Sequence, residues 1–377
     1  MGDFDFGSDM RGWEPMERLA SMTGNPLDSS PLESYEAKVT SMSMKALLSI
    51  LASLTVPASA VIVAGASGGG NTANNTTAAQ FQSEYGISFP AYDNVIRYSD
   101  ASGIYLGYDA ATKDVWVLTA RHVSSSLTQG ATVTIDGLVY NRQPNGGDGF
   151  GLLPGGDLRL VRYNRADLAV PTLPAVNIST SVPTAGTGLF MAGYGQNRTQ
   201  NATLGSSTSD AVSVTVGTGY NWSGTTIKRW GTNQIEAEFL NGLESTVPVA
   251  GTTGTFSLGP YNTIGYMTDF DQPGTGQWLN SNEAQGSLGD SGGSAFYYSG
   301  GQWYLSGIFT AVVGFSGQAG NTAAFGNLSL LTDVASYSGA INTALAGATL
   351  VPEPTSPALV FLAGLAIFSR RRRAARV

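Results

Sequence analysis

The sequence predicts an all-β protein of barrel architecture. Short runs of alternating apolar and polar residues recur from residue 95 to residue 309, and turn residues separate neighbouring runs. None of these runs keeps the 3.6-residue period of a helix over a useful length. Many short strands at such spacing are typical of a β-barrel.

The predicted strands follow those runs along the chain. The first two, residues 95–98 and 103–108, precede a turn at residues 110–114. The third, residues 115–118, leads to His122, the one histidine of the chain. The remaining strands are predicted at residues 131–135, 138–140, 158–163, 189–194, 211–216, 235–239, 294–298 and 303–309.

A signal peptide is predicted inside the N-terminal region. Residues 1–43 are acidic and polar, and we interpret them as disordered or as a mis-annotated upstream extension. Residues 44–60 combine a positive charge, an apolar run and a small-residue cleavage site ending at Ala60, which is the order of a secretory signal. Because such signals begin at the initiator methionine, we expect translation to start at Met42 or Met44. A cytosolic extension is the alternative.

The folded domain is expected to follow a linker. Residues 65–80 consist almost wholly of small and polar residues, which bury too little apolar surface to offset the entropy of ordering. We therefore predict a low-complexity tail at residues 61–86 and a folded domain at residues 87–350. The 291 residues from Val61 to Val351 suffice for two sizeable cores.

A candidate nucleophile lies in residues 289–293, which read Gly-Asp-Ser-Gly-Gly. The flanking glycines allow positive φ values, so the amide N–H groups of Gly289 and Ser291 can converge on one oxygen and form an oxyanion hole. A serine hydroxyl needs a base, and His122 is the candidate. A turn in a glycine-rich surface loop is the alternative, since 49 of the 377 residues are glycine.

Asp167 is the predicted third member of a catalytic triad, because a short aliphatic run, residues 168–170, follows it. Asp157 is the alternative: it precedes an apolar alternation but lacks the aliphatic run. The chain order His, Asp, Ser is that of chymotrypsin and differs from the orders of subtilisins and α/β-hydrolases. With these three segments the chain resembles the trypsin-like (chymotrypsin-fold) serine proteases.

The resemblance covers about residues 95–331. It implies two six-stranded antiparallel β-barrels with the active site in the cleft between them, His122 and Asp167 on the first barrel and Ser291 on the second. The chain has no cysteine, so the disulfide that usually braces the histidine loop is missing, with Val123 in its place.

Two further features follow from the resemblance. The spacing from the aspartate to the serine is longer than usual, so we expect an insertion at residues 196–209 or 221–255. The aspartate before the nucleophile, Asp290, is expected to be satisfied by backbone amides or a nearby side chain, with no activating cut. The alternative is a cut near Gly86 that frees Ile87.

The resemblance also places a specificity pocket. Its base is expected near Gln285, six residues before the nucleophile, and its wall near Thr310, Ala311 and Val312. Because Gln285 is neutral, we expect small, apolar or polar side chains at the cleaved position rather than lysine or arginine. A register error of two residues would place Glu283 at the base and reverse this expectation.

Charge and composition limit the partners. Residues 61–351 carry 10 Lys+Arg against 18 Asp+Glu, a net charge of −8, which disfavours nucleic acid and anionic membranes. No residue cluster has metal-ligand spacing, so we predict no cofactor and no metal, while a loop-bound calcium stays open. The expected partner is a protein or peptide substrate, and the expected state is a monomer.

The C-terminal residues 351–377 are predicted to be a sorting signal. Val351-Pro352-Glu353-Pro354 precedes an apolar run at residues 358–368, and arginines follow. The run is shorter than the ~20 residues of a comfortable membrane span. The order resembles the PEP-CTERM signal of Gram-negative bacteria, which implies a transient inner-membrane anchor removed by exosortase-type machinery. A plain C-terminal anchor is the alternative.

Taken together, these features predict an exported serine endopeptidase that works through an acyl-enzyme in the periplasm, cell envelope or extracellular matrix. Two alternatives stay open. One is a non-catalytic binding or structural protein of the cell surface on the same fold, and the other is an esterase that uses the same triad.

Overall fold

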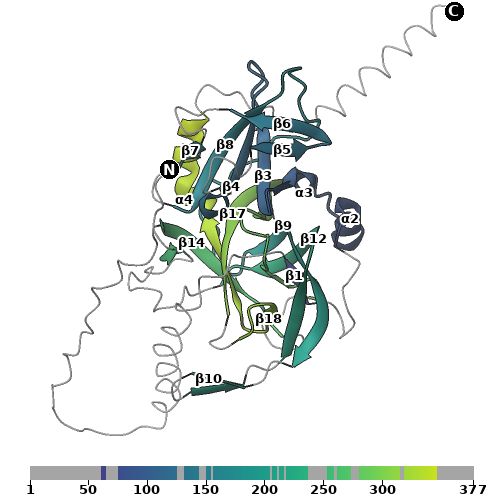
Figure 1. The fold of residues 1–377 in the computed structure, drawn as a ribbon, viewed down its shortest axis with the longest axis vertical. Helices are drawn as coiled ribbons and strands as arrows, with labels where there is room; N and C mark the ends of the chain where they lie inside the picture. Colours follow the sequence, from purple (N-terminus) through teal and green to yellow (C-terminus); the bar gives the residue numbers. More distant parts are fainter. Residues whose placement is uncertain are drawn as a thin grey trace, which may run out of the picture. The chain divides into compact units, whose positions relative to one another are not determined.

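Two antiparallel barrels make up most of the described structure, a computed structural model (Figure 1). It describes residues 61–64, 75–124, 131–143, 150–153, 156–203, 206–209, 212–215, 218–236, 253–258, 261–272, 280–314 and 318–345. The signal peptide, the N-terminal extension and the sorting signal lie outside these residues. Within them, no helix has the length and apolar character required to cross a membrane.

The first barrel contains six strands in the hydrogen-bonded order β2-β3-β4-β8-β6-β5. Its end strands, β2 and β5, contact each other, so the barrel is nearly closed. A short strand, β7 (Phe150–Leu152), pairs with β8 beside this path. The six strands are β2 (Val95–Tyr98), β3 (Ala101–Tyr108), β4 (Val115–Ala120), β5 (Thr132–Ile135), β6 (Leu138–Arg142) and β8 (Leu158–Asn164).

The second barrel also contains six strands, in the order β14-β19-β17-β16-β9-β12. Its ends meet where the Glu236 N–H, just past β12, donates to the Met267 carbonyl of β14 at 3.0 Å. The prediction of two six-stranded antiparallel barrels is confirmed. The strands are β9 (Gly188–Thr203), β12 (Thr218–Gln234), β14 (Tyr261–Asp269), β16 (Ser294–Ser299), β17 (Gln302–Val313) and β19 (Leu328–Asp333), with β13 (Gly254–Leu258) and β18 (Thr322–Ala324) at the edges.

The additional chain length expected before the serine forms a long β-ribbon. Strands β9 and β12 pair from Gly188↔Gln234 to Thr203↔Thr218, and a hairpin of β10 (Ser206–Ser209) and β11 (Val212–Thr215) lies between them in sequence. Much of the insertion predicted at residues 196–209 or 221–255 therefore consists of extensions of β9 and β12. The strand predicted at residues 235–239 is wrong at its start, because β12 ends at Gln234; residues 237–239 lie outside the described part.

Three helices of the described residues were not predicted: α2 (Ala78–Tyr85), α3 (Ala91–Asn94) and α4 (Val334–Ala344). Helix α2 begins with a capping box in which Thr77 and Gln80 exchange side-chain to backbone hydrogen bonds. Its Phe81 enters an aromatic cluster, with ring centroids 4.8 Å from Phe190 and 5.1 Å from Trp230. Helices α2 and α3 are too short for a period to show, whereas α4 carries one, because Val334, Tyr337 and Ile341 are spaced i, i+3, i+7.

The prediction of a low-complexity tail at residues 61–86 is wrong for two parts of this range, which form a strand and a helix. Residues 75–85 lead into and form helix α2, and β1 (Ile62–Val63) pairs with β15 (Ala284–Gln285) in register Ile62↔Gln285. Val61 is fully buried and packs with the apolar core of the second barrel. The apolar sequence Val-Ile-Val-Ala repays its ordering entropy by this burial. The folded domain thus begins before Ile87.

Candidate active site

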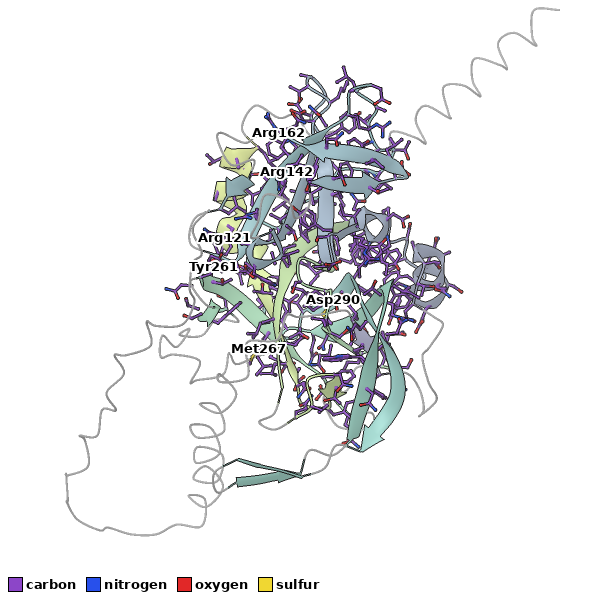
Figure 2. The ribbon with its side chains drawn as sticks, viewed as in Figure 1. Arg121, Arg142, Arg162, Tyr261, Met267 and Asp290 are labelled. Carbon is purple, nitrogen blue, oxygen red and sulfur yellow. The ribbon has the colours of Figure 1, made fainter. Side chains whose placement is uncertain are left out.

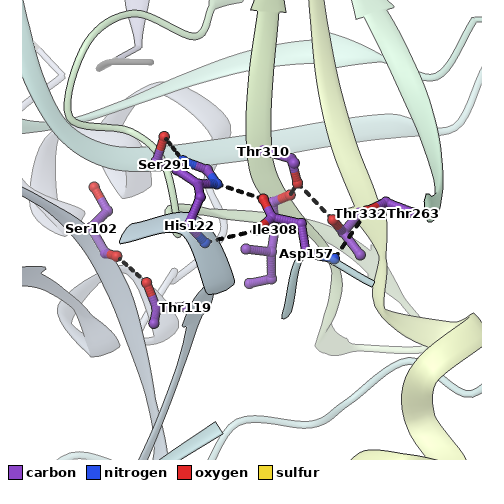
Figure 3. A network of polar contacts seen from close by, with 9 residues as sticks. All are labelled: Ser102, Thr119, His122, Asp157, Thr263, Ser291, Ile308, Thr310 and Thr332. Atoms are coloured by element: carbon purple, nitrogen blue, oxygen red, sulfur yellow. Dashed lines mark hydrogen bonds and ion pairs between the residues drawn. The ribbon is translucent and has the colours of Figure 1, made fainter. Parts of the chain in front are cut away.

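His122 and Ser291 meet between the two barrels (Figure 3). His122 lies in a 3₁₀ turn, η1 (Arg121–Ser124), directly after β4 of the first barrel. Ser291 precedes β16 of the second barrel and is 3% exposed. The His122 Nε2 atom lies 2.9 Å from the Ser291 Oγ atom, which is hydrogen-bonding distance.

The carboxylate on the other side of the imidazole belongs to Asp157. Its Oδ2 lies 2.6 Å from His122 Nδ1, and its Oδ1 accepts the His122 backbone N–H at 2.9 Å. The Asp157 side chain is fully buried, whereas the His122 side chain is 33% exposed. A carboxylate at Nδ1 assigns the proton to that nitrogen, so Nε2 is free to accept the serine proton.

The prediction of Asp167 as the third residue of the triad is corrected, because Asp157 and not Asp167 contacts the imidazole. Its side chain is 58% exposed, and its carboxylate accepts two hydrogen bonds of 2.9 Å from the Arg165 guanidinium. This interaction, together with the Ala169 N–H, lowers the pKa of Asp167 to about 2. Residues 165–170 form a turn instead of the strand that the aliphatic run suggested.

Strand register explains why Asp157 reaches the imidazole. Strands β4 and β8 are antiparallel, with Ala120 opposite Leu158. The residues just after β4 and just before β8 therefore lie at the same edge of the barrel, and these are His122 and Asp157. Asp167 follows the far end of β8, roughly 20 Å along the strand at ~3.3 Å per residue. The sequence signal for Asp157 was its position at the start of the alternating run.

Strand β14 of the second barrel contacts Asp157 and also Arg121, the neighbour of His122. The Asp157 backbone N–H donates to Thr263 Oγ1 at 2.9 Å, and Thr263 is fully buried (Figure 3). Two residues earlier on the same strand, the Tyr261 ring lies under the guanidinium of Arg121, at 4.5 Å from its centroid (Figure 2). Arg121 directly precedes the histidine. Thr263 carries no local sequence signal, because only the fold brings it to the first barrel.

The C-terminal helix α4 contacts the same turn. A Cβ at Gly156 would lie 2.6 Å from Tyr337 Cζ, so only glycine leaves room for the Tyr337 ring beside the turn that carries the carboxylate. The Tyr337 hydroxyl accepts the Ile264 backbone N–H at 2.9 Å. Helix α4, Gly156 and β14 are thus packed together around the base of the candidate site.

The N–H groups of Gly289 and Ser291 are the two predicted donors of the oxyanion hole. Each belongs to a peptide whose carbonyl accepts a backbone hydrogen bond. The Leu288 carbonyl accepts the Gln196 N–H at 3.1 Å, and the Asp290 carbonyl accepts the Gly293 N–H at 2.5 Å. In a trans peptide the C=O and the next N–H point in opposite directions. The N–H groups of Gly289 and Ser291 therefore point away from these partners, and neither binds another described residue.

Glycine is required at two positions of this loop. Gly289 has φ +106° and Gly292 has φ +82°, values that other residues rarely adopt. A Cβ at Gly289 would overlap the Tyr194 carbonyl, and a Cβ at Gly292 would overlap the Ser102 carbonyl and Thr119 Oγ1. The glycine framing of the serine thus serves both backbone conformation and close packing.

Asp290 is only partly satisfied within the fold. Its Oδ2 accepts the Ser287 N–H at 3.3 Å, in agreement with the expected backbone partner. Its Oδ1 is buried and has no hydrogen-bond partner among the described residues. Burial raises the pKa of the Asp290 carboxyl well above its usual range. The expectation of full internal satisfaction is therefore met on one oxygen only.

The segments predicted to form the specificity pocket lie close together. A Cβ at Gly286 would lie 3.0 Å from Val312 Cγ1, which brings the residue after Gln285 against the predicted wall. Gln285 is buried, and its Oε1 has no hydrogen-bond partner among the described residues. Glu283 is directed elsewhere, since its Oε1 accepts the Asp271 N–H at 2.6 Å.

The two wall residues before Val312 are also buried. The Thr310 hydroxyl donates to the Ile308 carbonyl at 3.1 Å and is also hydrogen-bonded to Thr332 Oγ1 at 2.6 Å (Figure 3). Ala311 lies in an apolar cluster of the second barrel. Among the described residues, no group of three or more His, Cys, Asp and Glu side chains could hold a metal ion.

Fold and site together define a two-barrel β protein with a Ser–His–Asp arrangement between the barrels. No protein-family model and no curated protein matches the chain. Among solved structures, kallikrein-related peptidase 10 is similar at 12% identity and a TM-score of 0.35, covering 68% of this chain and 98% of that one. Its complex with Zn²⁺ gives 14% and 0.37 over the same shares.

A viral protease is similar at the same level. The NS6 protease from murine norovirus 1 has 14% identity and a TM-score of 0.31, covering 63% of this chain and 90% of that one. With TM-scores below 0.5, these likenesses carry no weight for the chemistry of this chain. The fold is assigned from its own strand order.

Proposed function

We propose that the chain is an exported serine endopeptidase. The observation that carries the proposal is the continuous contact from Ser291 Oγ through His122 to Asp157, with 2.9 Å at Nε2 and 2.6 Å at Nδ1. A buried serine alone would be inert. A serine joined to an imidazole that a buried carboxylate orients is the arrangement of an activated nucleophile.

The mechanism follows from the proton positions. His122 Nε2 takes the proton of Ser291 as the hydroxyl oxygen attacks a peptide carbonyl, and Asp157 stabilises the imidazolium that forms. The imidazolium then gives its proton to the leaving amine, and an acyl-enzyme remains. Water, deprotonated by the same imidazole, releases the acyl group.

The N–H groups of Gly289 and Ser291 would hold the negative oxygen of the tetrahedral intermediate. This role is supported by the carbonyls of Leu288 and Asp290, which precede the two N–H groups. Each carbonyl accepts a backbone N–H, so the N–H of the same peptide points the opposite way. Amides fixed before the reaction need no reorganisation when charge develops. Losing one such donor costs on the order of 10²–10³ in turnover.

The proposed base of the specificity pocket, Gln285, is neutral. Gln285 contributes a buried carbonyl oxygen that has no partner within the described part of the chain, and the carboxylate of Glu283 accepts the Asp271 backbone N–H. Without a free carboxylate at its base, the pocket would not select lysine or arginine. We expect small, apolar or polar side chains at the cleaved position.

Export and sorting are proposals that rest on sequence alone. The signal peptide at residues 44–60 and the PEP-CTERM-like segment at residues 351–377 support a location in the periplasm, cell envelope or extracellular matrix. The exosortase-type machinery would act on the second segment.

Substrate profiling on a purified chain of residues 61–351 tests the proposal. A fluorophosphonate probe should label the wild type and leave Ser291→Ala unlabelled. Peptide hydrolysis lost in both Ser291→Ala and His122→Ala, with unchanged thermal unfolding, is the expected result. Absence of labelling would favour a non-catalytic surface protein, and turnover of esters without peptides would favour an esterase.

A further inference from the structure

Ser102 joins the first barrel to the loop that carries the nucleophile. It lies on β3, is fully buried, and sits next to Gly289 and Tyr194 of the second barrel. Its hydroxyl donates to the Gly289 carbonyl at 2.6 Å and accepts the Tyr194 N–H at 2.7 Å. Both directions are determined, because a carbonyl only accepts and an amide N–H only donates.

The backbone of Ser102 is held at the same junction. Its N–H donates to the Ser291 carbonyl at 3.0 Å, and its own carbonyl accepts Thr119 Oγ1 at 2.8 Å (Figure 3). Ser102 thus contacts the nucleophile loop at two carbonyls, one on each side of Asp290. The triad as described does not use any of these contacts.

The hydroxyl bond acts on the peptide that follows Gly289. At the preceding peptide, the Leu288 carbonyl is held by the Gln196 N–H. Gly289, whose φ is +106°, therefore lies between two anchored carbonyls, one fixed by β9 and the other by the Ser102 hydroxyl. Gly289 has no side chain to restrict its orientation, so these two anchors, together with the bond from the Asp290 N–H to the Ser287 carbonyl at 3.4 Å, set where its N–H points.

We propose that Ser102 is a positioning residue for the oxyanion hole, and that its buried hydroxyl holds the Gly289 amide in the orientation that stabilises the tetrahedral intermediate. The inference rests on the proposed serine-hydrolase function. It concerns a side chain that does not touch the substrate, so its loss should affect the chemical step more than substrate binding.

Ser102→Ala tests this with Ser179→Ala as the matched control. Ser179 is also fully buried, and its hydroxyl bonds the Ser181 carbonyl at 2.7 Å and Tyr297 Oη at 3.1 Å, away from the nucleophile loop. For Ser102→Ala we expect kcat to fall about 10- to 100-fold while KM changes less than about threefold. Affinity for a peptide aldehyde, which forms a tetrahedral adduct with Ser291, should fall in parallel. Ser179→Ala should keep kcat within about twofold.

Ser102→Cys covers the case in which the alanine variant does not fold. It keeps a side chain of similar shape but replaces the hydroxyl by a thiol, a weak donor and acceptor, so an intermediate fall in kcat is expected. Wild-type kcat and aldehyde affinity in whichever variant folds would overturn the inference, as would an equal loss in Ser179→Ala. A wild type without labelling or turnover would instead refute the proposed function, and the inference with it.

Discussion

Gly193 lies against the buried carboxylate of Asp290, so closely that a Cβ at Gly193 would overlap Oδ1. Asp290 directly precedes the nucleophile, so displacing its side chain should displace the loop. We expect Gly193→Ala to destabilise the fold by about 1–3 kcal/mol and to lower kcat by about 10- to 100-fold. Gly188→Ala on the same strand, with open space at its Cβ, is the control. Equal effects of the two in thermal unfolding and kinetics would contradict this reading.

Asp157→Asn should lower kcat by on the order of 10⁴, because an amide at this position no longer enforces the tautomer with a free Nε2. Asp167→Asn should leave kcat within about twofold, since its carboxylate is exposed and bound to Arg165. Steady-state kinetics of both variants measures this. A large loss in the Asp167 variant, with the Asp157 variant active, would restore the sequence-based assignment.

A pair of aspartates in the second barrel should make stability fall as pH rises. Burial, followed by the charge of Glu236, raises the pKa of Asp269 to about 6, and burial with the charge of Asp269 does the same for Asp271. Between about pH 4 and pH 6 the folded state holds protons that the unfolded state has lost, so deprotonation disfavours folding in this window.

The amide variant Asp269→Asn imitates the protonated form. The Tm of the variant minus that of the wild type should therefore increase from pH 4 to pH 7, with most of the change between about pH 4, the unfolded pKa, and about pH 6, the folded pKa. Thermal unfolding of both chains across this range is the measurement. A difference in Tm that stays constant with pH would show that the carboxyl is not perturbed.

Strand β1 should be required for a stable second barrel. A chain that starts at Gly65 loses four buried apolar residues, Val61, Ile62, Val63 and Ala64, and each of the three larger side chains contributes about 1.5–3 kcal/mol. We expect a lower Tm and lower turnover than for a chain that starts at Val61, because β15, which carries the predicted pocket base Gln285, loses its partner. Identical unfolding curves would mean that β1 is dispensable.

Removing residues 351–377 should release active enzyme from the cell envelope with unchanged specific activity, because every residue of the candidate site lies upstream of them. Cell fractionation with an activity assay measures release. Mass spectrometry of the native protein gives an independent check: a mature chain that still carries Arg370 would argue against removal of the segment.

The sequence predicted the barrels and two of the three candidate catalytic residues, because alternation, a unique histidine and a glycine-framed serine are local signals. It did not select Asp157, because the choice between two aspartates depends on which end of β8 lies beside His122, and that is a matter of strand pairing. Thr263 and Ser102 carry no local signal, since their partners are 106 and 187 residues away.

Strand β1 was missed for a related reason. A two-residue strand such as Ile62–Val63 has no period to detect, and its stability comes from β15, which is more than 200 residues away. The glycine- and asparagine-rich sequence after it suggested a tail, although the apolar residues at its start pack in the core of the second barrel.

The position of β1 bears on the loop that carries Ser291. Val61 is the residue that would follow the predicted signal-peptide cut, and extending the register by one step places it beside Gly286, next to the amide that binds Asp290. Among the described residues, no group pairs with Asp290 Oδ1, so this neighbourhood of β1 holds a buried carboxylate with one free acceptor. A change in the strand pairing at β1 would therefore reach the loop that carries Ser291 through Gly286 and Ser287, so that fraying at one edge of the second barrel would appear as lost order at the nucleophile.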